Sequence, residues 1–210
     1  IAVFEDLNLT IESGTFVAIL GSNGCGKSTL ASLLLRTHPP DRGKILLDEA
    51  DSAWIPLSEW RSICSIVPQQ AELFPGSIAE NIAPHTRKPD LLKIQQLCQW
   101  VGLQDLLDQL PDNLQTQIGT GGRMLSGGEC QKIALARALY RNPTVLILDE
   151  ATAHLDPPSR KAWYKLLKGL AGEGKCIILI SHDEEGNSIA DCTLNLEKLM
   201  RISEGGRPRT

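Results

Sequence analysis

The chain has 210 residues, a formal net charge of −4 and 42% hydrophobic residues. This length favours one domain, the composition fits a soluble globular protein, and the acidic balance argues against a broad nucleic-acid-binding face. Six scattered cysteines without a CxxC pair argue against a zinc site and a dense disulfide framework, and they favour a reducing compartment. No apolar run approaches the ~18 residues that a membrane span needs, and no signal peptide is visible.

The first part of the chain predicts strands around one helix. Alternating apolar and polar residues predict a strand over Val3–Ile11, and the apolar run Phe16–Leu20 predicts a buried parallel strand. A helix is expected over Lys27–Leu35. It should end there, because Pro39 and Pro40 follow soon afterwards. Two further strands are expected at "KILL" and "SICSIV".

The middle of the chain has helical spacing. One helical stretch runs from about Pro89 to Leu110, and a second helix should start near Gly127 and continue through "ECQKIALARALY". Buried strands return at "TVLILDE" and "KCIILISH", with the helix "SRKAWYKLLKGL" between them. Strands that alternate with helices predict an α/β fold with a largely parallel sheet. We expect a core of about residues 1–69 and 143–210, with a helical subdomain inserted at about residues 70–142.

A glycine-rich segment, "GSNGCGKST", fits the pattern G-x-x-x-x-G-K-[ST] between the second predicted strand and the first helix. Glycines let backbone N–H groups approach phosphates closely, and the helix N-terminus adds partial positive charge. Lys27 would neutralise phosphate charge, and the Ser28 hydroxyl would ligate Mg²⁺. The alternative is an ordinary turn between a strand and a helix. The predicted nucleotide-binding residues are Gly21, Ser22, Asn23, Gly24, Cys25, Gly26, Lys27, Ser28 and Thr29.

Two carboxylates follow the apolar run of "VLILDE". At the carboxyl end of a buried parallel strand they would meet the phosphate loop at the ligand-binding edge of the sheet. Asp149 would then hold Mg²⁺ through water, and Glu150 would orient or deprotonate the attacking water. The alternative is a strand that ends in a solvated acidic turn.

The segment "LSGGE" opens the second predicted helix with an anion-binding geometry of its own. Ser126 also fits an N-cap with Glu129 at the third helical position, which predicts a capping box. The two roles are compatible. The residues of this signature segment are Leu125, Ser126, Gly127, Gly128 and Glu129.

The order of "GSNGCGKST", "VPQQ", "LSGGE", "VLILDE", "AHLD" and "ISH" resembles the nucleotide-binding domain of ABC transporters over nearly the whole chain. In that family the phosphate loop of one subunit and the signature segment of the other clamp one ATP, which accounts for the second anion site. The resemblance implies a P-loop NTPase (RecA-like) core with a mainly parallel sheet, an N-terminal antiparallel β part and a helical insert.

The resemblance also implies roles for single residues. Gln69 looks like the glutamine that reaches Mg²⁺ and the attacking water, and Asp156 looks like the residue that communicates across the dimer. His182 looks like the switch histidine that touches the γ-phosphate, with a packing role as the alternative. The implied catalytic residues are Glu150, His182, Gln69 and Lys27. The implied Mg²⁺ ligands are Ser28, Gln69 and Asp149.

Two stretches, "ELFPGSIAENI" and "TQIGTGGRMLSGGE", resemble exporter-type members of the family. The resemblance therefore implies an ATP-hydrolysing motor domain of an exporter that dimerises around two MgATP. Its partners would be a second such domain, in a homo- or heterodimer, and a transmembrane domain, with no nucleic acid. It would lie at the cytoplasmic face of the membrane. The alternatives are a soluble ABC ATPase of DNA repair, chromosome structure or translation, and a degenerate cassette that binds ATP and regulates.

Several positions depart from the family pattern. Glu129 replaces the usual glutamine, His154 stands where a small residue is usual, and Gln117 stands where exporters often have glutamate. Because Glu129 and His154 depart from the pattern, the alternative of a degenerate cassette that regulates is not excluded. The aromatic residue that stacks on adenine would precede Ile1, which favours a longer parent chain. It also predicts weak nucleotide binding with poor discrimination between ATP and GTP.

Overall fold

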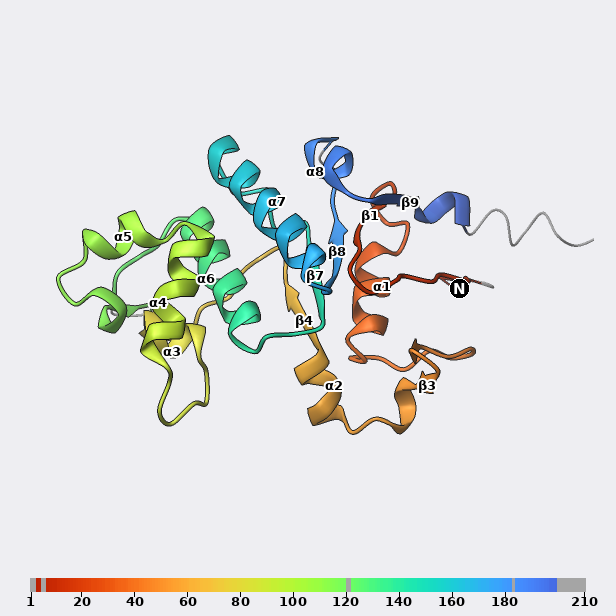
Figure 1. The fold of residues 1–210 in the computed structure, drawn as a ribbon, viewed down its shortest axis with the longest axis horizontal. Helices are drawn as coiled ribbons and strands as arrows, with labels where there is room; N and C mark the ends of the chain where they lie inside the picture. Colours follow the sequence, from red (N-terminus) through yellow and green to blue (C-terminus); the bar gives the residue numbers. More distant parts are fainter. Residues whose placement is uncertain (1–2, 5–6, 120–121, 183, 200–210) are drawn as a thin grey trace, which may run out of the picture.

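The structure of the chain, a computed structural model, describes residues 3–4, 7–119, 122–182 and 184–199. Its centre is a five-stranded sheet in which every neighbouring pair is parallel (Figure 1). In spatial order the strands are β4 (Cys64–Val67), β7 (Val145–Asp149), β8 (Cys176–Ile180), β1 (Phe16–Leu20) and β9 (Cys192–Asn195). The predicted α/β fold with a mainly parallel sheet is confirmed.

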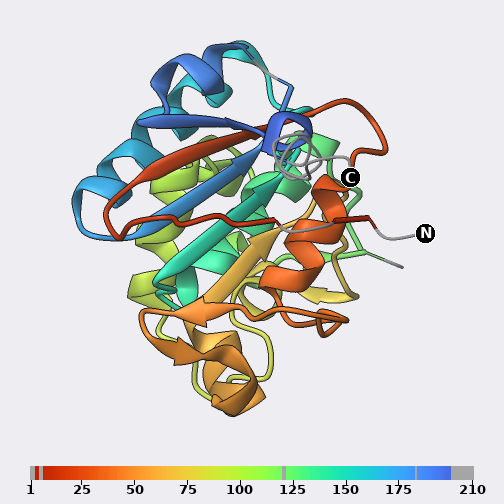
Figure 2. The ribbon, with the colours of Figure 1, turned by 90° about the vertical axis from the view of Figure 1, so that its right-hand side faces the viewer.

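Alternate side chains of the strands pack on opposite faces of this sheet. Leu146 and Leu148 of β7 point into a cluster with the helices α6 (Gly127–Tyr140) and α7 (Pro157–Gly172). Ile147 lies in a second cluster with residues of α1 (Lys27–Leu34). Figure 2 shows α1 on the near side of the sheet, and Figure 1 shows α6 and α7 on the opposite side. Burial on both faces explains why these strands are continuous apolar runs.

Among the described residues between β4 and β7, four α-helices group together on one side of the molecule (Figure 1). They are α3 (Ile78–Ile82), α4 (Leu91–Val101), α5 (Gln104–Asp108) and α6. The single helical stretch expected over Pro89–Leu110 is two helices, because α4 ends at Gly102 in a left-handed conformation with φ of 80°. We propose the boundaries of the helical subdomain, about 70–142, on this grouping.

The antiparallel part consists of two short pairs, β2 (Leu46–Leu47) with β3 (Ala50–Asp51), and β5 (Gly76–Ser77) with β6 (Gln117–Ile118). The strand expected over Val3–Ile11 is not found, because its described residues form no strand. Its apolar side chains are partly buried against the sheet: Phe4, Leu7, Leu9 and Ile11. In the described part of this segment, the alternation of apolar and polar residues therefore reflects burial of one side of an irregular segment. The strand expected at "KILL" is limited to its last two residues.

The sequence did not predict several elements. They are the helices α2 (Leu57–Ile63), α3 and α8 (Glu184–Ile189), the strands β3, β5, β6 and β9, and the short 3₁₀ helices Ser52–Trp54 and Asn113–Gln115. The helix α2 takes the first two residues of the expected strand "SICSIV", and its Trp60 indole donates to Leu34 O at 2.9 Å. None of the helices among the described residues combines the length and apolar character that crossing a membrane requires.

Candidate functional site

The glycine-rich loop joins β1 to α1, as the sequence predicts. Gly24 and Gly26 have φ angles of 82° and 102°, which is the left-handed region that glycine adopts without steric cost. Gly26 is the N-cap of α1 and provides no side-chain cap, so the first-turn N–H groups of α1 lack a side-chain acceptor at this position. Such amides, together with the positive end of the helix dipole, form an anion-binding site.

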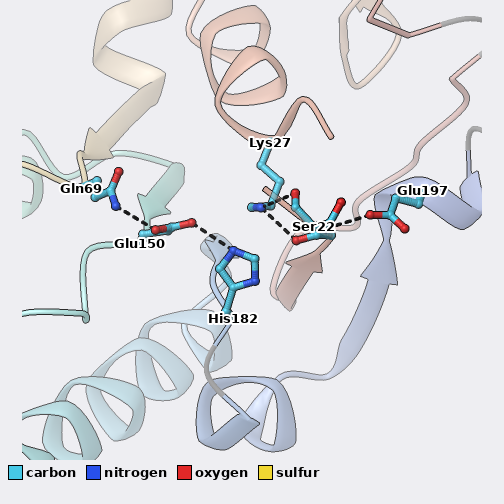
Figure 3. A network of polar contacts seen from close by, with 7 residues as sticks. Ser22, Lys27, Gln69, Glu150, His182 and Glu197 are labelled. Carbon is cyan, nitrogen blue, oxygen red and sulfur yellow. Dashed lines mark hydrogen bonds and ion pairs between the residues drawn. The ribbon is translucent and has the colours of Figure 1, made fainter. Parts of the chain in front are cut away.

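Lys27 is the first residue of α1, directly after the loop, and only 6% of its surface is exposed. Its Nζ donates to Gly21 O at 2.9 Å and to Ser22 O at 3.0 Å (Figure 3). These bonds fold the side chain back over its own loop and fix the position of the ammonium group. A positive charge is thus held at the point where the phosphate chain would lie.

Glu197 contacts the same loop and was missed by the sequence analysis. Its Oε1 accepts a hydrogen bond from Ser22 N at 2.8 Å, and Figure 3 shows it beside the loop. Glu197 follows β9, so this bond ties the first residues of the loop to a segment far away in sequence. No local pattern signals this pairing, since it depends on β9 lying beside β1 in the sheet.

Three predicted catalytic residues meet at one point. Gln69 follows β4, Glu150 follows β7 and His182 follows β8, so three strand ends supply them. Gln69 Nε2 donates to Glu150 Oε2 at 2.8 Å, and His182 Nε2 lies 3.3 Å from Glu150 Oε1 (Figure 3). Glu150 therefore stands between the other two side chains, which orients both of its oxygens.

The backbone of Glu150 is held in an unusual conformation. Its φ is 49°, in the left-handed region that a non-glycine residue rarely occupies. Its N–H donates to Ile180 O at 2.8 Å, at the end of the neighbouring strand β8. A strained backbone conformation persists only where many surrounding contacts hold it in place. Such conformations cluster at functional sites. The carboxylate also lines a pocket of about 230 Å³ with Thr152, Ala153, Arg160, Ser181 and His182.

Asp149, the last residue of β7, is half-buried and lies near the phosphate loop. The pKa of Asp149 is raised overall, mainly by burial and then by the nearby charge of Glu150. The charge of Lys27 and a hydrogen bond with Ser28 act in the opposite direction and lower it. The Ser28 hydroxyl and the Asp149 carboxylate therefore lie together, and oxygen ligands are what Mg²⁺ prefers. The described residues contain no cluster of three His, Cys, Asp or Glu side chains that could hold a metal. Few protein ligands are typical of Mg²⁺ that is bound together with substrate phosphates.

The signature segment opens α6, and the predicted capping box is present. Ser126 is the N-cap, and its N and Oγ both donate to Glu129 Oε2, at 2.7 Å and 2.8 Å. The segment also packs against the turn after β7. A Cβ on Gly127 would lie 3.5 Å from His154, and one on Gly128 would lie 3.1 Å from His154 O. The first of these distances is an ordinary van der Waals contact, whereas the second is tight against the backbone. Glycine at position 128 therefore allows a close approach between the signature helix and that turn.

Asp156 is placed at the N-terminus of α7, where its side chain accepts from Ser159 N at 2.9 Å. Hydrogen bonding to Ser159 is the main reason why the pKa of Asp156 is lowered. The local role of this residue is thus a helix cap. Its role across a dimer stays a prediction.

Replacement of Gly26 by alanine should weaken ATP binding at least ~10-fold, because the site needs both its conformation and its empty space. The new Cβ would lie 2.7 Å from Val3 Cγ1 and 2.8 Å from Phe4 Cζ. Backbone strain at positive φ costs a further ~1–2 kcal/mol. Gly43→Ala is the matched control, since Gly43 has a φ of 82° with nothing within 4 Å of its Cβ position. Calorimetric titration should show near-normal binding in the control, and normal binding by Gly26→Ala would contradict the assignment of the loop.

Comparison with known proteins gives a consistent result. A family model described as "ABC transporter" matches residues 4–153. The chain is 40% identical over 183 residues to "ABC transporter BEA3" of Gibberella fujikuroi, and 42% identical over 181 residues to the "ATP-dependent lipid A-core flippase" of Alkalilimnicola ehrlichii. It matches the solved "Structure of a bacterial Atm1-family ABC exporter with ATP bound" with a TM-score of 0.80 and 34% identity.

These matches cover most of this chain but little of the other proteins. The covered shares of this chain are 87%, 86% and 87%, in the same order. The chain spans 14% of the fungal transporter, 31% of the bacterial flippase and 32% of the exporter chain. The likeness therefore concerns one part of larger proteins.

Proposed function

The chain belongs to the ABC transporter family, and from this premise we propose that it is the ATP-binding and ATP-hydrolysing motor domain of an exporter. The observation that carries the proposal is the contact of Glu150 with both Gln69 and His182, next to Asp149 and the phosphate loop. The three relatives described above, a transporter, a flippase and an exporter with ATP bound, support the assignment to export.

In the proposed reaction, water attacks the γ-phosphate in line with the leaving oxygen. Glu150 orients this water and accepts its proton, which typically contributes 10²–10⁴-fold to a rate. Lys27 and the loop N–H groups stabilise charge on the phosphates, and His182 contacts the γ-phosphate. Mg²⁺, held by Ser28, Asp149 and Gln69, would supply further charge neutralisation. Catalysis is therefore mostly positioning and electrostatic stabilisation.

The proposed partner is a second nucleotide-binding domain, identical to this one or different. Two-fold symmetry would bring Ser126 and the first turn of α6 of one chain onto the ATP that the other chain holds. A transmembrane domain would use the closing and opening of this dimer to move its substrate. Because the chain belongs to the ABC transporter family, we also propose that it lies at the cytoplasmic face of the membrane.

A regulatory cassette is the second candidate, and one observation favours it. The Glu129 carboxylate holds the Ser126 hydroxyl, so a negative charge lies next to the group that would meet the γ-phosphate. Repulsion between the two anions would weaken this composite site. The contact of Glu150 with Gln69 and His182 supports the hydrolytic role instead.

Phosphate release distinguishes the two candidates. The protein should release phosphate from ATP in excess Mg²⁺, release should fall to background in EDTA, and fresh Mg²⁺ should restore it. The oxygen ligands at Ser28 and Asp149 are the reason for this dependence. Hydrolysis that is insensitive to EDTA would contradict the metal assignment. ATP binding without any hydrolysis in Mg²⁺ would favour the regulatory cassette.

A further inference from the structure

Gln131 is a buried polar residue in α6 to which the mechanism above assigns no role. Only 1% of its surface is exposed. Its Nε2 donates to Pro68 O at 3.1 Å and to Gln69 O at 2.6 Å. Its Oε1 is buried without a hydrogen-bond partner among the described residues. Burying an amide with one unsatisfied oxygen is costly, so its persistence in a core calls for a reason.

The two acceptors of Gln131 explain where it acts. Pro68 and Gln69 follow directly after β4, and the side chain of Gln69 is the one that donates to Glu150 at 2.8 Å. Gln131 therefore fixes the main chain at the residue whose side chain contacts the catalytic carboxylate. Gln131 also lies on α6, whose N-cap is Ser126, so its bond to Gln69 O connects the signature helix to Gln69 of the same chain.

Another residue of α6, Arg137, already holds the segment after β4 to this helix. Arg137 Nε donates to Asn81 O at 2.7 Å, and its NH1 donates to Glu72 O at 3.0 Å. Its guanidinium also lies over the Phe74 ring, 5.7 Å from the centroid. The segment that follows Gln69 is thus held to the helix without Gln131, whereas Gln131 bonds to the carbonyl of Gln69 itself.

We propose that Gln131 is a positioning residue for ATP hydrolysis, which acts by holding the backbone at Gln69 so that the Gln69 amide meets Glu150. This inference rests on the proposed function. In the absence of the Gln131 amide, two neighbouring carbonyls lose their donor and the main chain at Gln69 can shift. A shift of about 1 Å at a catalytic group can cost as much as ~10²-fold in rate.

The test is a set of variants measured by phosphate release and by nucleotide titration. Gln131→Met keeps the length of the side chain but removes the donor, and it should lower kcat at least ~10-fold while the Kd for ATP stays within about twofold. Gln131→Glu, which replaces the donor with an acceptor, should not rescue kcat. Arg137→Lys is the matched control on the same helix, and it should lower the melting temperature with kcat nearly unchanged.

A double-mutant cycle separates positioning from a general effect on folding. In a Gln69→Ala background, Gln131→Met should cause no further loss of kcat, because the group it positions is gone. An equal loss in both backgrounds, or an unchanged kcat in the single variant, would overturn the inference. The parent protein and Glu150→Gln complete the set. If the parent protein fails to hydrolyse MgATP, the proposed function fails. If the parent hydrolyses and Gln131→Met does so equally well, only the role of Gln131 fails.

Discussion

Replacement of Lys27 by alanine should abolish MgATP hydrolysis, with a loss of at least ~100-fold. The ammonium group is almost fully buried within the loop, where two carbonyls hold it at 2.9 Å and 3.0 Å. In the complex it would exchange these carbonyls for phosphate oxygens. Hydrogen bonds to charged groups contribute about 1.5–3 kcal/mol each, so the loss of two corresponds to about 10²–10⁴-fold in rate or affinity.

Two controls accompany Lys27→Ala. Lys27→Met keeps most of the buried aliphatic stem, so it separates the loss of charge from the loss of packing. Lys44→Ala removes an exposed lysine outside the site and should hydrolyse ATP normally. Steady-state phosphate release is the readout for all three. A rate near that of the parent protein in Lys27→Ala would contradict the assignment of the active site.

Replacement of Glu150 by glutamine should lower hydrolysis ~10²–10⁴-fold, the usual contribution of a general base. Glutamine has the same shape, and its amide oxygen can still accept the hydrogen bond from Gln69 that Glu150 accepts at 2.8 Å. Asp149 and the phosphate loop are unchanged, so MgATP should still bind. Glu173→Gln is the matched control, because Glu173 is exposed at the end of α7. Single-turnover hydrolysis and a binding titration measure the two effects separately.

A bound nucleotide that is not hydrolysed should keep two chains together, if Ser126 of one chain meets the ATP of the other. Adding Ser126→Arg to Glu150→Gln should prevent this association, because a bulky side chain would then fill the shared interface. The same change should leave the fold intact, since Ser126 is an exposed N-cap. Association that is unaffected by Ser126→Arg would show that the signature segment does not lie at the interface.

The sheet was predictable because β1, β7 and β8 are buried on both faces and therefore appear as apolar runs. Prediction failed for elements whose conformation depends on contacts with the rest of the fold. The segment Val3–Ile11 has the alternation of a strand but forms no ladder in its described part. The helix expected over Pro89–Leu110 breaks at Gly102, whose left-handed conformation ends α4. The strand β9 is short and half polar, so its pairing with β1 is its main determinant.

The candidate site was predictable to a similar degree. The strand end pointed to Glu150, and the resemblance to ABC transporters implied Gln69 and His182. The fold brings all three together at strand ends. Glu197 and Gln131 were not identified, because they act through hydrogen bonds to main-chain atoms distant in sequence. Such bonds carry no periodicity and no recognisable residue pattern. They follow from how the strands and α6 pack.

The central claim, that two chains share one MgATP, is tested most directly by light scattering of the 210-residue chain carrying Glu150→Gln. Without nucleotide the mass should be that of one chain, 22.9 kDa. With saturating MgATP it should rise to twice that value, and it should return to 22.9 kDa when EDTA removes the metal. A mass of 22.9 kDa at high protein concentration, with MgATP shown to be bound, would contradict the shared site.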